Sequence, residues 1–269
     1  MKARSILLVL AFCACAAGLH AQAVVSGFTE TGNLPRNDDN NSSAINLGFS
    51  LNFYGTSYSQ TYVSNNGYLT FGQGQGEYSP SGLGAGYSGL PIISAFFDDV
   101  DTRNAATGIV SWGTGTFQGR TAFAATWPNV GEFSNGSSPN TFQIILVERS
   151  DTGIGNFDIY FNYNTITWDH GGAAAGYNNG ISSAPVFYQL AGSLQSGAFV
   201  NGGPNALATN SNIFPTASDY ALGRYLFQAR NGDFVPPPPA VPEPSTYVLL
   251  VLGAGVMGSS IFRRRRHAA

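Results

Sequence analysis

Short runs in which apolar and polar residues alternate occupy the middle of the chain, and turn-forming residues separate them. Residues 45–54 alternate, as expected for a strand that is buried on one face. Residues 140–149 are the most continuously apolar run, which predicts a strand at the centre of a sheet. Between residues 24 and 234 no stretch keeps a helical period. Strands are predicted at residues 45–54, 60–64, 68–71, 91–97, 108–112, 120–127, 141–149, 156–163, 187–190 and 224–229.

The segments between these runs indicate how the strands connect. Asn65, Asn66 and Gly67 separate two predicted strands and tolerate positive φ, so this pair is predicted to form a hairpin. Residues 72–89 and 192–218 are long and rich in small polar residues, and loops of that length are usually functional or mobile. The predicted fold is all-β: a β-sandwich-like, two-sheet domain with long Gly-rich loops.

The beginning of the chain has the pattern of an export signal. Lys2 and Arg4 precede an apolar run at residues 6–17, and Ala21-Gln22-Ala23 supplies the small-x-small pattern that signal peptidase cleaves. We expect a signal peptide at residues 1–23, with cleavage after Ala23 or, as the alternative, after Ala21. The exported β domain then spans residues 24–234.

The end of the chain has three features in a fixed order. A Pro-rich linker at residues 235–241, expected to be stiff and extended, leads to a Pro-Glu-Pro motif, an apolar run at residues 247–262 and a cluster of arginines. As a helix, the 16 apolar-run residues would reach about 24 Å, short of the roughly 30 Å hydrocarbon core. We therefore expect a transmembrane helix at residues 247–262 that spans only marginally, with the arginines on the cytoplasmic side.

This order of features resembles the PEP-CTERM sorting signal of Gram-negative bacteria. The resemblance covers residues 242–266 and implies processing by an exosortase-type membrane enzyme. It also implies anchorage in the membrane that is at least transient, followed by release to the cell surface or the extracellular matrix. The residues that form the signal are Pro242, Glu243, Pro244, Arg263, Arg264, Arg265 and Arg266.

The amino-acid composition of the exported part excludes several kinds of site and partner. Cys13 and Cys15 lie inside the predicted signal peptide, so the exported body has no cysteine for disulfides or thiolate metal sites. Without the two basic residues of the signal and the four terminal arginines, 6 of the 12 basic residues remain. Without Glu243, 14 of the 15 acidic residues remain, which gives a formal charge of −8 and no lysine. Such a surface repels phosphate, so we expect no nucleic-acid partner.

One motif identifies the body. The apolar strand at residues 91–97 runs directly into Asp98-Asp99-Val100-Asp101-Thr102-Arg103. A predicted hairpin at residues 62–71 precedes this motif, and the segments 107–112, 122–127, 140–146, 157–163 and 175–177 follow it in that order. Over roughly residues 46–182 this arrangement resembles the nidogen-like extracellular (NIDO) domain. The resemblance implies an extracellular binding or structural module that is associated with cell–matrix adhesion and has no catalytic residues. Animal members adjoin cysteine-rich modules that are absent here, so the resemblance assigns no partner.

The acidic motif has two interpretations. Asp98, Asp99 and Asp101 repel one another unless they are compensated, and a solvated strand end with Arg103 or Arg120 as counter-charge would suffice. Alternatively, the three carboxylates are a candidate Ca²⁺ site, because clustered hard oxygen ligands suit this ion; no other cofactor is expected. A second acidic cluster, Asp38-Asp39, lies in a turn-rich segment where such residues normally face water.

Catalysis has little support in the sequence. His170 is the histidine of the exported body, its neighbour is Asp169, and no G-x-S-x-G elbow occurs. Carboxylate pairs for glycoside hydrolysis are defined in space, so the sequence leaves that mechanism open. We expect a non-enzymatic protein.

The expected function is that of an exported surface or matrix protein, with a role in cell–matrix adhesion or a structural role in exopolysaccharide. The alternative is a carbohydrate-binding, lectin-like module, in which loop aromatics stack on sugars. The candidate aromatics are Tyr78, Tyr87, Trp127, Trp168 and Tyr177.

Overall fold

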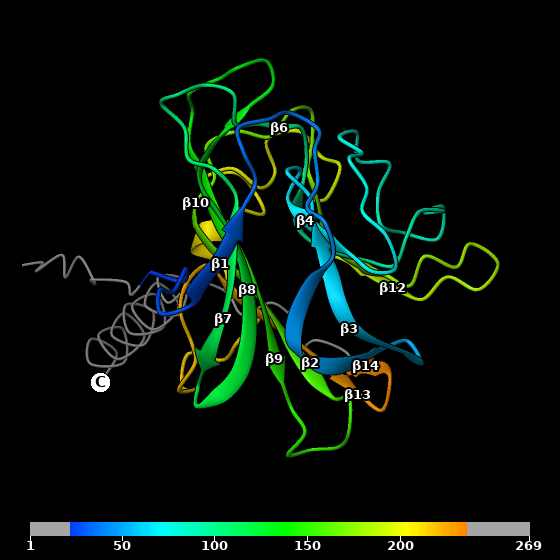
Figure 1. The fold of residues 1–269 in the computed structure, drawn as a ribbon. Coiled ribbons are helices and arrows are strands. Elements are labelled where there is room, and N and C mark those ends of the chain that lie inside the picture. Colours follow the sequence, from blue (N-terminus) through cyan, green and yellow to red (C-terminus); the bar gives the residue numbers. More distant parts are fainter. Residues whose placement is uncertain (1–21, 236–269) are drawn as a thin grey trace, which may run out of the picture.

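Two antiparallel sheets face each other in a computed structural model that describes residues 22–235 (Figure 1). The larger sheet has eight strands in the order β1-β7-β8-β9-β10-β13-β14, and β6 pairs with β8 beside this path. Its strands are β1 (Thr29–Asn33), β6 (Val100–Asp101), β7 (Ser111–Phe117), β8 (Arg120–Glu132), β9 (Asn140–Glu148), β10 (Phe157–Thr165), β13 (Arg224–Arg230) and β14 (Asp233–Val235).

The smaller sheet has six strands in the order β12-β11-β5-β4-β3-β2. Its strands are β2 (Ile45–Phe53), β3 (Thr56–Val63), β4 (Tyr68–Thr70), β5 (Ile92–Phe97), β11 (Ala174–Asn178) and β12 (Phe187–Gln189). One short 3-10 helix, η1 (Leu207–Thr209), is the helical element of the described part. The predicted all-β, two-sheet architecture is therefore confirmed.

Most predicted strands match observed ones within a few residues. The alternating run at residues 45–54 is β2, whose inward positions are buried, and the most apolar run is β9, which lies in the middle of the larger sheet. β8 continues past residue 127, because a bulge between Trp127 and Val130 takes up Pro128 and lets pairing with β9 resume at Asn140. The strand expected at residues 108–112 begins only at Ser111.

Four short strands, β1, β6, β11 and β14, were not predicted. They are two to five residues long, and their sequences are rich in Gly, Asn and Asp, which carry little strand signal. Each exists because a longer neighbouring strand offers it a partner: β7 for β1, β8 for β6, β5 for β11 and β13 for β14.

Aromatic and aliphatic side chains fill the space between the sheets. Trp127 stacks on Phe142 at 5.0 Å between ring centroids, and Phe96 meets both Phe142 and Trp168. Two smaller clusters lie apart from this core, one of them formed by Tyr68, Leu83, Tyr87, Ile92, Phe97 and Ala174. Leu83 and Tyr87 belong to the long segment 72–89, so this loop contributes buried apolar side chains to the fold.

The targeting segments fall outside this description. Outside residues 22–235 lie the predicted signal peptide up to residue 21 and the predicted linker from residue 236 onward. The predicted transmembrane helix at residues 247–262 and the sorting signal also lie outside them. Within the described residues, no helix has the length and apolar character needed to cross a membrane.

Candidate functional site

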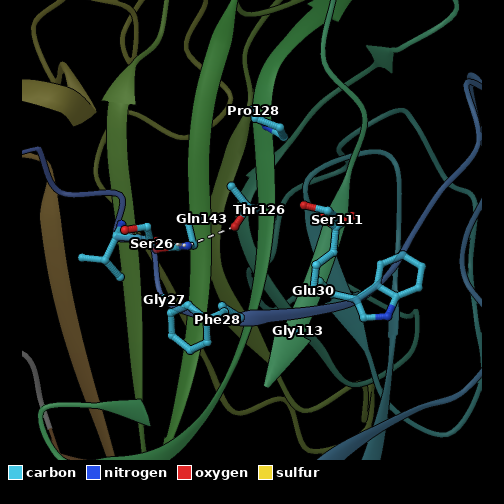
Figure 2. A pocket seen from close by; sticks show the side chains of 12 residues that line it. Ser26, Gly27, Phe28, Glu30, Ser111, Gly113, Thr126, Pro128 and Gln143 are labelled. Atoms are coloured by element: carbon cyan, nitrogen blue, oxygen red, sulfur yellow. Dashed lines mark hydrogen bonds between the residues drawn. The ribbon is translucent and has the colours of Figure 1, made fainter. Parts of the chain in front are cut away.

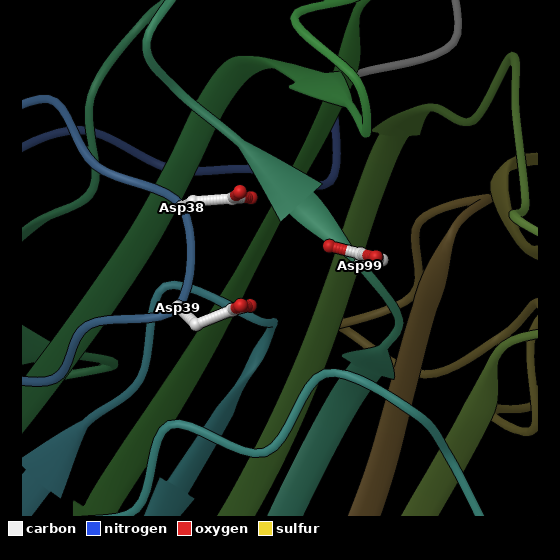
Figure 3. Close-up of side chains that lie close together, drawn as sticks. All are labelled: Asp38, Asp39 and Asp99. Carbon is white, nitrogen blue, oxygen red and sulfur yellow. The ribbon is translucent and has the colours of Figure 1, made fainter.

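Three carboxylates from two distant parts of the chain lie close together (Figure 3). Asp38 and Asp39 come from the segment between β1 and β2, and Asp99 follows β5. Each offers an oxygen, and these three atoms lie within 4.8 Å of one another. We call Asp38, Asp39 and Asp99 the acidic corner.

The hairpin turn between β3 and β4 holds the two acidic segments together. The Asn65 side-chain amide donates to the main-chain carbonyls of Asp38 and Val100. The Asn66 amide donates to Asp39 Oδ1 at 3.0 Å, and its oxygen accepts from Val100 N at 3.0 Å. Trp127 Nε1 in turn donates to the Asn65 carbonyl at 2.9 Å, which fixes the turn on the core.

The glycine-rich segment 72–89 also contacts the acidic corner. A Cβ on Gly76 would lie 2.1 Å from the Asp39 carbonyl oxygen, so only glycine fits there without movement. Tyr68 Oη donates to the Glu77 carbonyl at 2.8 Å and thereby ties the segment to β4. This loop was predicted to be functional or mobile, and the structure places part of it against the acidic corner.

The predicted trio of Asp98, Asp99 and Asp101 is not a solvated strand end, because these residues are only 1%, 8% and 0% exposed. Their side chains also diverge. Asp98 accepts from the main-chain N of its neighbour Asp99 at 2.9 Å and from His170 N at 2.7 Å.

Asp101 is paired with Arg103, as one of the two interpretations expected. The guanidinium donates from Nε at 2.9 Å and from Nη2 at 2.6 Å, and Nη2 also lies 2.8 Å from Asp38 Oδ2. The other candidate counter-charge was wrong: Arg120 pairs with Asp151, at 3.0 Å. Of the predicted trio, Asp99 alone belongs to the acidic corner.

Buried oxygens without a hydrogen-bond partner occur at the acidic corner. Among residues 22–235, the buried side-chain N and O atoms that lack a hydrogen-bond partner are Asp38 Oδ1, Asn65 Oδ1 and Asp99 Oδ1. Two belong to the acidic corner, and the third belongs to the asparagine bonded to the backbone of both acidic segments. Buried polar atoms are normally satisfied, so three orphans at one place require an explanation.

The electrostatics agree with this geometry. Burial, followed by the charges of Asp39 and Asp38, raises the pKa of Asp99 to about 6. Burial also raises the pKa of Asp98 to about 6 and, with the charge of Asp101, raises that of Asp38. Asp101 is the exception: although its burial acts in the opposite direction, the hydrogen bonds from Arg103 hold its pKa below the ordinary value. The ionised corner is thus stabilised incompletely by the protein itself.

The aromatic residues proposed for sugar stacking are mostly inside the protein. Tyr87, Trp127, Trp168 and Tyr177 are buried, whereas Tyr78 is 47% exposed. Their packing explains the burial: Tyr177 stacks on Phe234 at 4.0 Å, and Trp168 meets Phe96 edge-on. Of this set, Tyr78 alone has a ring that is accessible to a ligand in this structure.

No catalytic constellation accompanies His170 in the part of the chain that the structure describes. Its ring is exposed and lies edge-on to Phe133 at 6.0 Å, and its main-chain N is bound to Asp98. A shallow pocket of about 240 Å³ lies elsewhere, at the outer face of β8 near β1 (Figure 2). Its lining includes Gln143 and Thr126, joined by a hydrogen bond, and a single carboxylate, that of Glu30. A single carboxylate cannot provide the acid pair that glycoside hydrolysis requires.

Sequence reasoning missed the pairing of Asp38-Asp39 with Asp99. The available signal was the acidic Asp38-Asp39 pair in a turn-rich segment, which was judged to face water. Sixty residues separate Asp39 from Asp99, and only strand pairing brings them together. The role of Asn65 was also missed. The sequence indicated only that this residue permits a turn, whereas its side chain bridges both acidic segments.

Comparisons with known proteins agree with the fold and the motifs. The family described as NIDO related matches residues 16–218, and the PEP-CTERM protein-sorting motif matches residues 240–266. Alpha-tectorin from Gallus gallus is 29% identical over 166 residues, which cover 53% of this chain and 8% of the tectorin. Alpha-tectorin from Mus musculus is 32% identical over 164 residues, covering 53% and 7%.

Nidogen from Drosophila melanogaster is 28% identical over 142 residues, covering 44% of this chain and 10% of the nidogen. The chain therefore spans at most 10% of the length of these relatives. No solved structure matches it. The PEP-CTERM motif fits an exported protein that an exosortase-type enzyme processes. With three quarters of its length matched by one family, the chain belongs to the NIDO-related proteins and carries a PEP-CTERM sorting motif.

Proposed function

We propose that this protein is a non-catalytic component of the bacterial cell surface or extracellular matrix, with a role in cell–matrix adhesion or in organising exopolysaccharide. The observation that carries the proposal is the presence of a NIDO-related domain and a PEP-CTERM motif on one chain. The first is associated with extracellular matrix, and the second with export and sorting at the cell envelope.

The chemistry of the described residues supports a binding or structural role. The predicted exported body has a formal charge of −8 and no lysine, which is compatible with cations or neutral polysaccharide and unfavourable for nucleic acid. The shallow pocket beside β1 has one carboxylate, and its volume is below the range typical of small-molecule sites.

The sorting step follows from the tail. In this proposal the apolar run at residues 247–262 holds the chain in the membrane transiently, and the arginines after it stay on the cytoplasmic side. The prolines keep Glu243 in an extended segment at the membrane surface, because proline does not continue a helix. The processing enzyme then acts near this motif and releases the β domain to the surface or matrix.

Replacing Pro242, Glu243 and Pro244 by alanine tests the sorting step. In an exosortase-positive host we expect an unprocessed, membrane-bound form, detected by fractionation of cells and matrix and by mass spectrometry of the C-terminus. Replacing the linker residues Pro236, Pro237 and Pro238 by alanine is the matched control, which should be processed normally. Unchanged processing and location of the Pro242-Glu243-Pro244 variant would contradict the proposal.

The lectin-like alternative has one remaining observation in its favour, the exposed ring of Tyr78 in the glycine-rich loop. Glycan-array binding that Tyr78→Ala abolishes would favour it over adhesion. Retention in the matrix without glycan binding would favour adhesion or a structural role.

A further inference from the structure

We propose that Asp38, Asp39 and Asp99, together with the side-chain oxygen of Asn65, bind one Ca²⁺ ion. The ion would join the segment before β2 to the loop after β5. This site keeps one residue of the trio predicted from the sequence, Asp99, and replaces Asp98 and Asp101, whose oxygens are engaged elsewhere. The inference does not depend on the proposed adhesive role.

The unsatisfied oxygens are the first argument. Asp99 is 8% exposed and its carboxylate accepts no hydrogen bond, whereas Asp98 and Asp101, on either side of it, are both satisfied. Asp38 Oδ1 is also buried and unpartnered, and so is Oδ1 of Asn65, whose amide nitrogen is bonded to the Asp38 carbonyl. Exchanging the nitrogen and oxygen of the Asn65 amide would not solve the problem. The amide nitrogen donates to the carbonyls of Asp38 and Val100, and after the exchange the amide oxygen would face these two carbonyl oxygens. A bound cation would satisfy all of these oxygens together.

The spacing of the carboxylates is the second argument. Ca²⁺ binds oxygen at 2.3–2.6 Å, so two ligands on opposite sides of one ion lie about 5 Å apart. The three carboxylate oxygens lie within 4.8 Å of one another and can therefore reach one ion. The side chains converge from two separate segments (Figure 3). Water would complete the six to eight oxygens that this ion takes.

The balance of charge at the acidic corner also favours a cation. Arg103 contacts the corner through Asp38, but the same guanidinium also neutralises Asp101. Within the described residues, neither Asp39 nor Asp99 has an ion pair, and the charge of the buried Asp98 also acts on Asp99. The corner therefore has more negative charge than its protein partners neutralise, which favours a divalent cation.

The donor set selects the type of ion. Every unpartnered atom is a carboxylate or amide oxygen, and oxygen donors suit Ca²⁺ or Mg²⁺, whereas Zn²⁺ favours Cys and His. Mg²⁺ requires a nearly ideal octahedron at 2.0–2.1 Å, while Ca²⁺ accepts irregular geometry. Ligands that come from loops, at spacings set by strand pairing, fit Ca²⁺ better.

The experiment uses the full-length chain, purified and treated with chelator. Titration calorimetry with CaCl₂ should show one site with a Kd of roughly 10⁻⁴–10⁻³ M, the range of extracellular modules. At about 10 mM Ca²⁺ the thermal midpoint should rise by roughly 3–11 °C across this range of Kd. Mg²⁺ at the same concentration should bind at least about tenfold more weakly.

Asp99→Asn and Asp39→Asn should each remove the heat of binding and the thermal shift. Glu148→Gln removes the carboxylate of the last residue of β9, which has no ion pair among residues 22–235, and should behave as wild type. Asp99→Asn should keep its metal-free midpoint at or above wild type, because it removes an uncompensated buried charge. Should this variant fail to fold, the exposed Asp39 provides the same test at the surface. Absence of Ca²⁺ binding by wild type, or unchanged binding by both variants, would overturn the proposal.

Discussion

At the scale of single residues, Asp101 shows how a buried charge is satisfied. Its carboxylate accepts four hydrogen bonds, from the main-chain N of Arg103 and of Asn135 and from two atoms of the Arg103 guanidinium. The residue is completely buried, so these bonds replace all of its contact with water. Asp99, two positions away, has none of them. Two aspartates of one motif therefore have different roles. Asp101 stabilises the fold, whereas the carboxylate of Asp99 is available to a ligand.

Asp101→Asn should destabilise the fold. The substitution removes the charge that the guanidinium pairs with and replaces one acceptor oxygen by a donor that faces other donors. We expect a loss of roughly 2–4 kcal/mol in the free energy of unfolding, measured by urea denaturation. Asp151→Asn is the control, because that carboxylate is 38% exposed and solvent screens its ion pairs, so the loss should be much smaller. Equal losses for the two variants would contradict this account.

At the scale of elements, the turn between β3 and β4 positions the acidic corner. The predicted hairpin is confirmed: β3 pairs with β4, and Gly67 has a φ of +86°. Positive φ is a property of Gly67 within this turn and is not shared by Asn65 or Asn66. The two asparagines instead use their side chains to hold the acidic segments, a role that the local sequence pattern does not indicate.

Gly67→Ala should disrupt this element. A Cβ there would lie 1.7 Å from the Phe96 carbonyl oxygen, so the turn or β5 must move. We expect a loss of roughly 3 kcal/mol or more by urea denaturation, and impaired Ca²⁺ binding. Gly119→Ala is the matched control: its φ is +73°, but the added Cβ meets nothing within 4 Å, so its cost should be only about 1–2 kcal/mol. A Gly67→Ala loss no larger than that of Gly119→Ala would show that the close approach does not matter.

At the scale of the whole molecule, the body builds its core without cysteine and with many tyrosines. Burial raises the pKa of Tyr87 to about 12, and burial also raises those of Tyr68, Tyr160, Tyr177 and Tyr225. A tyrosine whose pKa is higher in the folded state than in the unfolded state stabilises the fold below pH 10, and this contribution is lost as pH rises further.

The protein should therefore unfold cooperatively between about pH 10 and 12. Each of these buried tyrosines costs about 1.4 kcal/mol per pH unit above 10, and several together exceed the stability of an ordinary domain. Circular dichroism and tyrosinate absorbance, followed together against pH, should change in one step. Titration of all tyrosines near pH 10 with the fold intact would contradict the prediction.

The sequence by itself determined the class of fold, the positions of the long strands, the motif that indicates the family and the sorting motif of the tail. These features are local: a strand buried on one face must alternate, as residues 45–54 do, and a sorting tail must keep its motif, apolar run and arginines in order. The same locality explains why β11 and β14 were missed. They are short, and they exist only because β5 and β13 provide partners.

Only the tertiary structure decided which side chains share a site. Asp98, Asp99 and Asp101 are neighbours along the chain, but successive side chains at the end of a strand point in different directions. Asp99 instead meets Asp38 and Asp39, because the hairpin turn and β5 bring their segments together. Likewise Trp168 and Tyr177, candidates for sugar stacking in the lectin-like alternative, are buried in the core between the two sheets. Contact between distant segments depends on sheet pairing and packing, which periodicity along the chain does not encode.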